Sequence, residues 1–353
     1  MTTHLHLRLA TLLLLLPACG GGNGGTGPTD PDGTNPYGIT ATGPGVLSVS
    51  PIDTSWVIST TPLGKLGPPG HVLPTDHVYI SFVDAYGGNQ QNNDCSKRPI
   101  YAAGSGVITF VLVTEERGDT KVDIQMTKTF HYYYDHVLLS PGMAPGTHVT
   151  AGQQIGTTTG FCPSFDLGAY DYDVTLPGLV NPARYGDNTK HTVSPYKYFT
   201  ESLRTLYYAR SRTFDGVPAN RDGRIDFGIP GKLVGDWFHS SLPVDAQSAG
   251  SPAGWAKSIG FVYDYFSGAA QVSVGGTIAA PFFGNTGAAD PDPATVTPAS
   301  GVVGYQIRRP GATETYGWML VQMTAADRIK VEFFLGATSR PAAFTAAAQE
   351  YLR

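Results

Sequence analysis

The sequence is poor in charge, in cysteine and in long amphipathic helical patterns. Lys, Arg, Asp and Glu make up 14% of its 353 residues, and the formal net charge is −5. Basic residues form no cluster, which argues against nucleic acid as a partner. Glycine (44), proline (27), tyrosine (19) and phenylalanine (16) are frequent instead. Abundant turn formers and aromatic residues without helical periodicity predict a mainly β protein.

The first 19 residues resemble a bacterial lipoprotein signal peptide. Arg8 precedes the apolar run Leu9–Leu16, which is too short to cross a bilayer as a helix. The letters LPAC that follow resemble a lipobox, in which Cys19 becomes the lipidated N-terminus after cleavage. The alternative is an ordinary signal peptide with an incidental cysteine. The resemblance implies an exported protein that is anchored to the membrane by lipid, at the periplasmic face or the cell surface. Gly20 after the cysteine resembles an outer-membrane address in a cell with two membranes.

Residues 20–45 are rich in Gly, Pro and Asp, as is typical of a flexible tether. Besides Cys19 the chain has only Cys95 and Cys162. In an exported chain such a pair is more often a disulfide than two free thiols. We therefore expect a Cys95–Cys162 disulfide, with two free thiols as the alternative.

The chain after the tether is long enough for two domains, roughly 150 residues each. A turn-dense segment, FDGVPANRDGRIDFG, favours a first domain over 46–212 and a second over 213–353. The first domain is predicted to consist of short strands, with TESLRTLYYARS as its one plausible helix. Six strand-like segments in the second predict a β-sandwich or small barrel. Its end, PAAFTAAAQEYLR, predicts a short helix with Pro341 in the first turn.

Within the second domain, GKLVGDWF resembles the G-x-W opening of a lipocalin barrel, with Gly235 and Trp237 at that spacing. A tryptophan buried in any β-sandwich explains these letters equally well. A small-molecule or lipid ligand of this domain is therefore one functional hypothesis.

The stretch FHYYYDHVLL, residues 130–139, predicts a strand of the first domain. Read with a period of two, Tyr132, Tyr134 and His136 share one face of this strand. His131 and Asp135 then face the other way, where a structural or exposed role is expected. An aromatic row of this kind is more often core than a groove lining.

Four segments in order resemble the lysostaphin/LytM-type metallopeptidases, zinc endopeptidases that cut peptidoglycan cross-links. They are RPIYAAGSGVITFV, YYYDHVLLSPG, HVTAGQQIGTTTGF and LVNPARY, within residues 68–186. The resemblance implies an antiparallel β domain, and it places His136 at the family's conserved strand histidine. It also implies zinc as cofactor and peptidoglycan or another envelope peptide as partner.

The sequence departs from the family where the metal should be held. The first ligand region reads GHVLPTDHVYI, and the region expected to read H-x-H is SFDLGAYDYDV, which has no histidine. A zinc site accepts carboxylates beside imidazoles, and a catalytic one needs three protein ligands. The candidate ligands are His71, His77 and either Asp166 or Asp171. His136 would then act on the reacting groups near the metal as a catalytic residue.

Each candidate also has a structural interpretation. His71 fits a surface loop, His77 fits a hydrogen-bonded strand end, and the aspartates fit Asx turns. The sequence therefore leaves three functions open. The first is metal-dependent hydrolysis of envelope peptides, with another divalent metal as an alternative to zinc. The second is an inactive relative that binds murein or protein, and the third is a ligand-binding lipoprotein.

Overall fold

The structure is a computed structural model that describes residues 36–82, 97–113, 118–159, 164–211 and 220–353. Cys19, Cys95 and Cys162 lie outside these residues, as do the leader, most of the tether and the predicted boundary at 212/213. Lipidation, the disulfide and the domain limits therefore stay predictions. Among the described residues, no helix combines the length and apolarity needed to cross a membrane.

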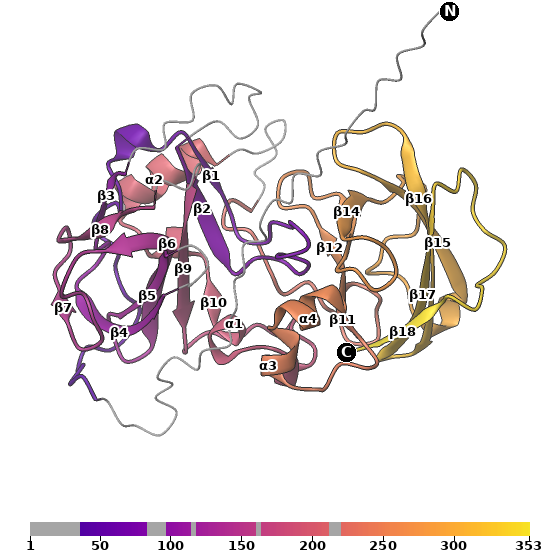
Figure 1. Cartoon of the computed structure of the whole chain (residues 1–353), viewed down its shortest axis with the longest axis horizontal. Helices are drawn as coiled ribbons and strands as arrows, with labels where there is room; N and C mark the ends of the chain where they lie inside the picture. The colour runs from indigo at the N-terminus through magenta and orange to yellow at the C-terminus, as the bar shows by residue number, and fades with distance from the viewer. Residues whose placement is uncertain (1–35, 83–96, 114–117, 160–163, 212–219) are drawn as a thin grey trace, which may run out of the picture.

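The fold is mainly β, as the composition predicts, and consists of an antiparallel sheet followed by a closed barrel (Figure 1). The main path of the sheet runs β1-β2-β9-β6-β5-β4-β7, with β10 on β9 and with β8 on β3 and β6. Its strands are β1 (Ser59–Thr61), β2 (His77–Ser81), β3 (Pro99–Tyr101), β4 (Gly106–Val113), β5 (Thr120–Gln125), β6 (Phe130–Leu139), β7 (His148–Val149), β8 (Gln154–Thr158), β9 (Ser164–Asp171) and β10 (Thr192–Val193).

One face of the sheet packs on an apolar core. Phe130, Tyr132 and Tyr134 of β6 are fully buried there, together with Phe165 and Leu167 of β9. The hydroxyls of the two tyrosines donate to backbone carbonyls at 2.8 and 2.9 Å, which satisfies their polar ends. The aromatic row of FHYYYDHVLL is thus core, and the opposite face is left for polar side chains.

A β-bulge interrupts the alternation of β6. Thr120 pairs with Val137 and Val122 pairs with Tyr134, so β6 has one residue more than β5 in this interval. Within the interval His136 has φ +62°, a left-handed conformation that is uncommon for residues other than glycine. The predicted shared face of Tyr134 and His136 is therefore wrong, because a period of two holds only for an unbroken strand.

The second sheet closes into a barrel in the strand order β11 to β18, and β18 pairs with β11. The strands are β11 (Gly235–His239), β12 (Ser258–Tyr263), β13 (Ala270–Val274), β14 (Phe282–Asn285), β15 (Val302–Arg308), β16 (Thr315–Ala325), β17 (Arg328–Leu335) and β18 (Gln349–Leu352). The predicted C-terminal helix is absent from residues 341–353, and β18 stands there instead. Closing the barrel gives β18 two neighbours, and this tertiary pairing outweighs the weak local helix preference of the segment.

The barrel interior is filled by side chains. Trp237, Phe261, Tyr305, Met319 and Tyr351 are fully buried in one apolar cluster. The indole of Trp237 donates to the carbonyl of Leu233 at 2.7 Å. These side chains occupy the space that a ligand inside the barrel would need, which counts against the third function.

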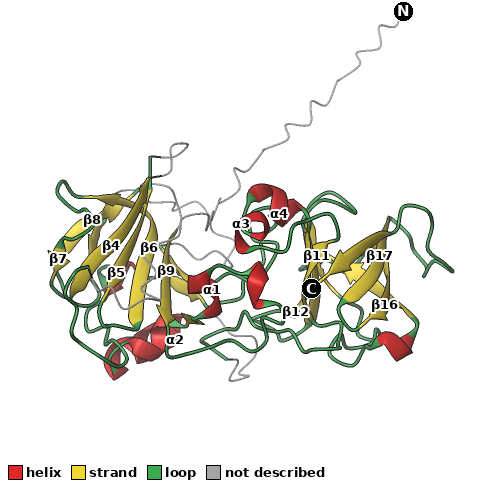
Figure 2. Cartoon of the chain, turned by 90° about the horizontal axis from the view of Figure 1, so that it is seen from below, coloured by secondary structure: helices red, strands yellow, loops and turns green. Residues whose placement is uncertain are grey.

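Short helices lie along the sheet, at its junction with the barrel and beside β16 (Figure 2). They are η1 (Thr54–Trp56), η3 (Pro182–Arg184), α1 (Asp187–Lys190), η4 (Pro195–Tyr198), α2 (Glu201–Arg210), α3 (Ala246–Ala249), α4 (Pro252–Ala256) and η5 (Pro298–Ser300). Helix α2 confirms the one helix expected before the second domain. Helices α3 and α4, which follow β11, lie between the two sheets (Figure 1).

A small apolar cluster joins the two halves of the chain. Phe238, Leu242 and Ala249 from the barrel side pack with Leu73 and Tyr185 from the sheet side, and we call these five residues the junction cluster. Burial of this apolar surface fixes the barrel against the polar face of the sheet. The polar face and the barrel thereby become the two walls of one site.

Candidate functional site

Strands β2, β9 and β6 lie side by side and place polar residues on the face away from the core. Tyr79 of β2 pairs with Asp166 of β9, which in turn pairs with Asp135 of β6. His77 is opposite Gly168 in the same register. Residues that are distant in sequence therefore meet on three adjacent strands.

His77 lies between two carboxylates. Its Nδ1 donates to Oδ1 of Asp76 at 3.0 Å, and its Nε2 is 3.3 Å from Oδ2 of Asp166. The hydroxyl of Tyr79 is 3.1 Å from the same Nε2. All of these groups are largely buried, so the ion pairs are shielded from water and the imidazole orientation is fixed.

The bulge of β6 turns His136 onto the same face. Its Nδ1 donates to Oδ2 of Asp119 at 2.6 Å, and its Nε2 lies 3.5 Å from Oδ2 of Asp166. The backbone N–H of His136 donates to Oδ1 of Asp135 at 2.8 Å, which ties the bulge to its own side chain. Asp166 is thus the carboxylate shared by His77 and His136.

Tyr133 reaches the cluster because a glycine lies beneath its ring. A Cβ on Gly168 would come within 2.0 Å of the ring, so only glycine leaves room for it. The hydroxyl of Tyr133 donates to Oδ1 of Asp76 at 3.2 Å. The ammonium of Lys121 lies 4.0 Å from the ring centroid of Tyr133 and adds a cation–π contact.

His71 is held by the loop before β2 rather than by a strand. Gly67 and His71 form an isolated antiparallel bridge, which fixes the loop backbone. The His71 ring lies 5.3 Å from that of His77, edge to face. Its Nε2 is buried and makes no hydrogen bond to the described residues. Burial, together with the charge of His77, lowers the pKa of His71 to about 3, so the ring is neutral at neutral pH.

The carboxylates have the opposite influence on His77. Burial by itself would lower its pKa, but the charge of Asp166 and the hydrogen bond to Asp76 outweigh it and raise the pKa of His77. Burial likewise acts to raise the pKa of Asp76, yet the hydrogen bond and the charge of His77 bring it below the ordinary value. Each partner of the pair therefore favours the charged form of the other.

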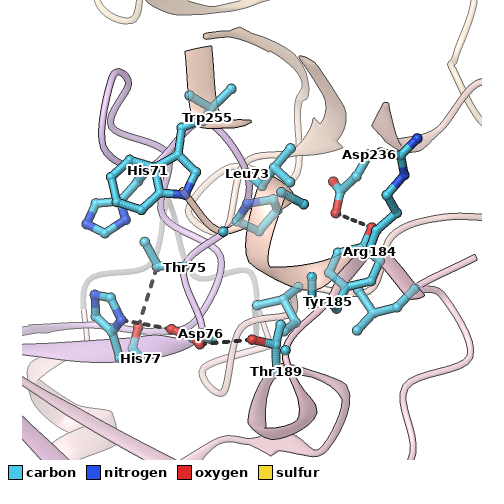
Figure 3. Close-up of a pocket in the computed structure, with 18 of the residues that line it drawn as sticks. His71, Leu73, Thr75, Asp76, His77, Arg184, Tyr185, Thr189, Asp236 and Trp255 are labelled. Atoms are coloured by element: carbon cyan, nitrogen blue, oxygen red, sulfur yellow. Dashed lines mark hydrogen bonds and ion pairs between the residues drawn. The ribbon is translucent and has the colours of Figure 1, made fainter. Parts of the chain in front are cut away.

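A cavity of about 140 Å³ opens beside this cluster, at the junction of sheet and barrel (Figure 3). His71, Asp76 and His77 line its sheet side, and Trp255 of α4 lines its barrel side. The side chains of Trp255 and His71 line the same cavity (Figure 3). The cavity thus combines an aromatic wall with charged groups, which is the usual make-up of a ligand site.

A polar row from α1 and the barrel lines the far side of the cavity. Thr189 donates to Oδ2 of Asp76 at 3.5 Å, and the hydroxyl of Tyr185 donates to Oδ2 of Asp236 at 2.9 Å (Figure 3). Burial raises the pKa of Asp236 to about 6. The guanidinium of Arg184 lies over the ring of Phe238 and is anchored on the carbonyls of residues 242 and 243. The far wall is therefore held by both halves of the chain.

The donor atoms do not fit a metal as they stand. Within the described ranges, no three His, Cys, Asp or Glu side chains are arranged so that they could hold a metal ion. Both ring nitrogens of His77 and of His136 lie against carboxylate oxygens. Zinc thus remains an implication of the sequence resemblance.

The structure brings His71, His77, His136 and Asp166 together and leaves Asp171 apart. Asp171 lies at the other end of β9, where it accepts from the Tyr198 hydroxyl at 3.0 Å and from the backbone of residue 173. Of the two candidate aspartates, Asp166 is the one that lies in the cluster, and its role as a metal ligand stays a prediction. The five-residue separation along β9 reverses the face, because side chains alternate along a strand.

Sequence reasoning missed several partners in the cluster. No sequence motif pointed to Asp119, Tyr133 or Trp255. Asp135 was predicted to lie on the face away from His136. The glycine within SFDLGAYD was an available signal, because a glycine inside a strand often marks a close approach of another group. His131 is buried on the same polar face, with Nδ1 2.8 Å from Asp123, so its structural role is as expected.

No family model matches the sequence, and no curated protein matches it. Among solved structures, it is similar to Helicobacter pylori Csd3 (18% identity, TM-score 0.30, 46% of this chain and 39% of that one). A zinc-containing peptidase from Vibrio cholerae has 18% identity, a TM-score of 0.28, and coverage of 36% of this chain and 37% of that one.

The catalytic domain of the antimicrobial peptidase lysostaphin from Staphylococcus simulans is similar as well. The identity is 16% and the TM-score 0.25, with 35% of this chain and 90% of that one covered. The chain spans well under half the length of the Csd3 and Vibrio cholerae proteins. At TM-scores this low the likeness carries no argument about activity, so function has to be argued from the residues themselves.

Proposed function

We propose that the chain is an exported lipoprotein that binds a peptide of the cell envelope, with one side chain of the peptide in the 140 Å³ junction cavity, without cutting it. The lipobox-like LPAC and the tether support the anchored location, and the four ordered segments that resemble lysostaphin-type domains support murein as the source of the peptide. Binding through a divergent site is the second of the functions that the sequence leaves open.

One observation carries the choice of binding over hydrolysis. The imidazoles of His77 and His136 have carboxylates at both ring nitrogens, and both meet at Asp166. Asp76 and His77 of this network line the junction cavity and bring polar side chains to a ligand there. A metal ligand must instead keep a free nitrogen lone pair. The adjoining cavity, which Trp255 and His71 both line, offers a peptide an aromatic surface beside these charges.

A second candidate is metal-dependent hydrolysis, and His71 favours it. Its Nε2 is buried without a hydrogen-bond partner among the described residues, and the ring is neutral and next to His77. A divalent metal held by His71, His77 and Asp166 would activate water, but the present arrangement of these side chains supports no step of that kind.

The test uses the mature full-length chain with insoluble murein. We expect the protein to sediment with murein and to release no soluble peptide fragments, with or without added zinc. Trp255→Ala should reduce the sedimenting fraction at least fivefold, whereas Trp318→Ala, on barrel strand β16, should leave it unchanged. Failure of the wild-type chain to sediment would refute binding. Zinc-dependent release that His136→Ala abolishes would establish hydrolysis instead.

A further inference from the structure

A second cavity, of about 560 Å³, lies on the outer wall of the barrel. Tyr265 and Phe266 from the β12–β13 turn and Phe283 of β14 form its aromatic part. Gln271 of β13 and Asn285 of β14 add two amides to its lining. A cavity of this size accommodates a ligand larger than a single amino acid, since ligand pockets measure roughly 300–1,000 Å³.

The two amides form a fixed pair on adjacent strands. Gln271 and Asn285 are register partners, and Nε2 of Gln271 donates to Oδ1 of Asn285 at 2.8 Å. Gln271 is only 4% exposed, so its orientation is set by packing. The carbonyl of Gln271 and the amide N–H groups of Asn285 are not used in this bond. The pair therefore offers one acceptor and one donor side by side to a ligand in the cavity.

The turn that separates β12 from β13 is well fixed. Oδ2 of Asp264 accepts from both the backbone N–H and the hydroxyl of Ser267, at 2.9 and 2.7 Å. The same turn also borders a further cavity of about 250 Å³, which Phe227 and Tyr263 line as well. Tyr265 and Phe266 of this turn therefore line both cavities.

Lys65 connects this wall to the histidine cluster. It lines the 560 Å³ cavity, and its ammonium lies 4.2 Å from the ring centroid of Tyr79. The hydroxyl of Tyr79 is in turn 3.1 Å from Nε2 of His77. Lys65 and Tyr79 thus form a chain of contacts from the 560 Å³ cavity to the histidine cluster.

We propose that the 560 Å³ cavity binds the glycan part of murein, and in particular its N-acetylated sugars. The C–H faces of a pyranose ring pack on aromatic side chains, and vicinal hydroxyl or acetamido groups need a donor and an acceptor close together. The aromatic lining and the Gln271–Asn285 pair supply both. This inference rests on the proposed function, because glycan and peptide are joined in murein and would occupy the two cavities together.

The test titrates the full-length chain with two probes in separate calorimetric experiments. One is the N-acetylglucosamine tetramer without peptide, and the other is a free murein stem peptide without sugar. Gln271→Leu and Asn285→Ala should each weaken tetramer binding at least tenfold while the stem peptide binds as before. Gln322→Leu, an amide on β16 outside the cavity, is the matched control. Thermal melting verifies that Asn285→Ala, which replaces a partly exposed side chain, remains folded.

The outcomes separate the two proposals. Tetramer binding that depends on Gln271 and Asn285 supports the glycan site. If the tetramer does not bind, or binds equally to the variants, the glycan site is refuted while stem-peptide binding still supports the proposed function. If the tetramer binds but the stem peptide does not, the glycan site stands and the proposed function fails. A stem peptide that binds through Asn285 would assign this cavity to peptide and refute the glycan site.

Discussion

The ring of Tyr133 lies directly against the backbone of Gly168, its register partner on the neighbouring strand β9. Because nothing projects from Gly168, the phenol reaches across β9 to Asp76, at the edge of β2. A strand glycine thereby decides which groups surround the junction cavity.

Replacing Gly168 with alanine should disrupt this contact. The new Cβ would lie within 2.0 Å of the Tyr133 ring and force it away from Asp76. We expect a loss of about 1–3 kcal/mol in the free energy of unfolding, as is typical of overpacking. Urea denaturation measures it. Gly260→Ala is the control, because a Cβ there meets only atoms at 3.5 Å and beyond. Equal stability of the two variants would contradict the close contact.

Because of the bulge, we expect glycine at position 136 to give a more stable protein than alanine. With φ at +62°, the left-handed conformation costs an alanine roughly 1 kcal/mol that glycine avoids. His136→Gly should therefore be more stable than His136→Ala in chemical denaturation, although both lose the imidazole. At Gln154, an exposed position of β8, the order should reverse, with alanine the better residue. The same order at both positions would argue against the bulge.

Because the pKa of Asp236 is raised, we expect the free energy of unfolding to fall as the pH rises. Burial raises its pKa to about 6 from an ordinary 3.8, so the folded state favours the protonated acid. The stabilisation is complete below pH 3.8 and is lost as the pH rises through 6, by up to about 3 kcal/mol. Asp236→Asn removes this titration and keeps an acceptor for Tyr185. Its stability relative to wild type should rise between pH 4 and pH 7, whereas the exposed Glu314→Gln should show no such rise.

Arg353, which follows the last barrel strand, contacts residues within and just before the first barrel strand. Its guanidinium lies 4.1 Å from the ring centroid of Trp237 and donates to the carbonyls of Ile229, Leu233 and Val234. Lysine keeps the charge but not the planar fork, so Arg353→Lys should cost about 2–3 kcal/mol in thermal or urea unfolding. Arg340→Lys, at an exposed arginine, should change stability by less than about 0.5 kcal/mol. If Arg353→Lys also changed stability by less than about 0.5 kcal/mol, the contacts of Arg353 would not stabilise the barrel.

The sequence predicted the architecture better than the local geometry of the site. Alternating residues and turns marked most strands, and the barrel was one of the two second-domain folds expected from six segments. The short strands β14 and β18 escaped notice, because Phe282–Asn285 is brief and Gln349–Leu352 follows an alanine-rich stretch with helical character. Their conformation is decided by neighbouring strands rather than by local propensity.

The candidate site was predicted in composition but not in arrangement. His71, His77, His136 and Asp166 were singled out by motif, and they do gather. Their partners Asp119 and Tyr133 could not be found, because register between strands is needed to bring them near. The predicted orientation of His136 was wrong for a single reason, because one extra residue in β6 shifts the alternation of the side chains that follow it.

The junction cluster has a practical consequence for anyone who divides this chain. A cut within residues 212–219 would leave Phe238 and Leu242 on one fragment and Leu73 and Tyr185 on the other, each without its apolar partner. Newly uncovered surface of this kind favours aggregation and poor expression. Weak murein binding by an isolated fragment would then result from its insolubility rather than from the loss of a binding site. Co-expression of both fragments, followed by tests for reassembly, would distinguish the two.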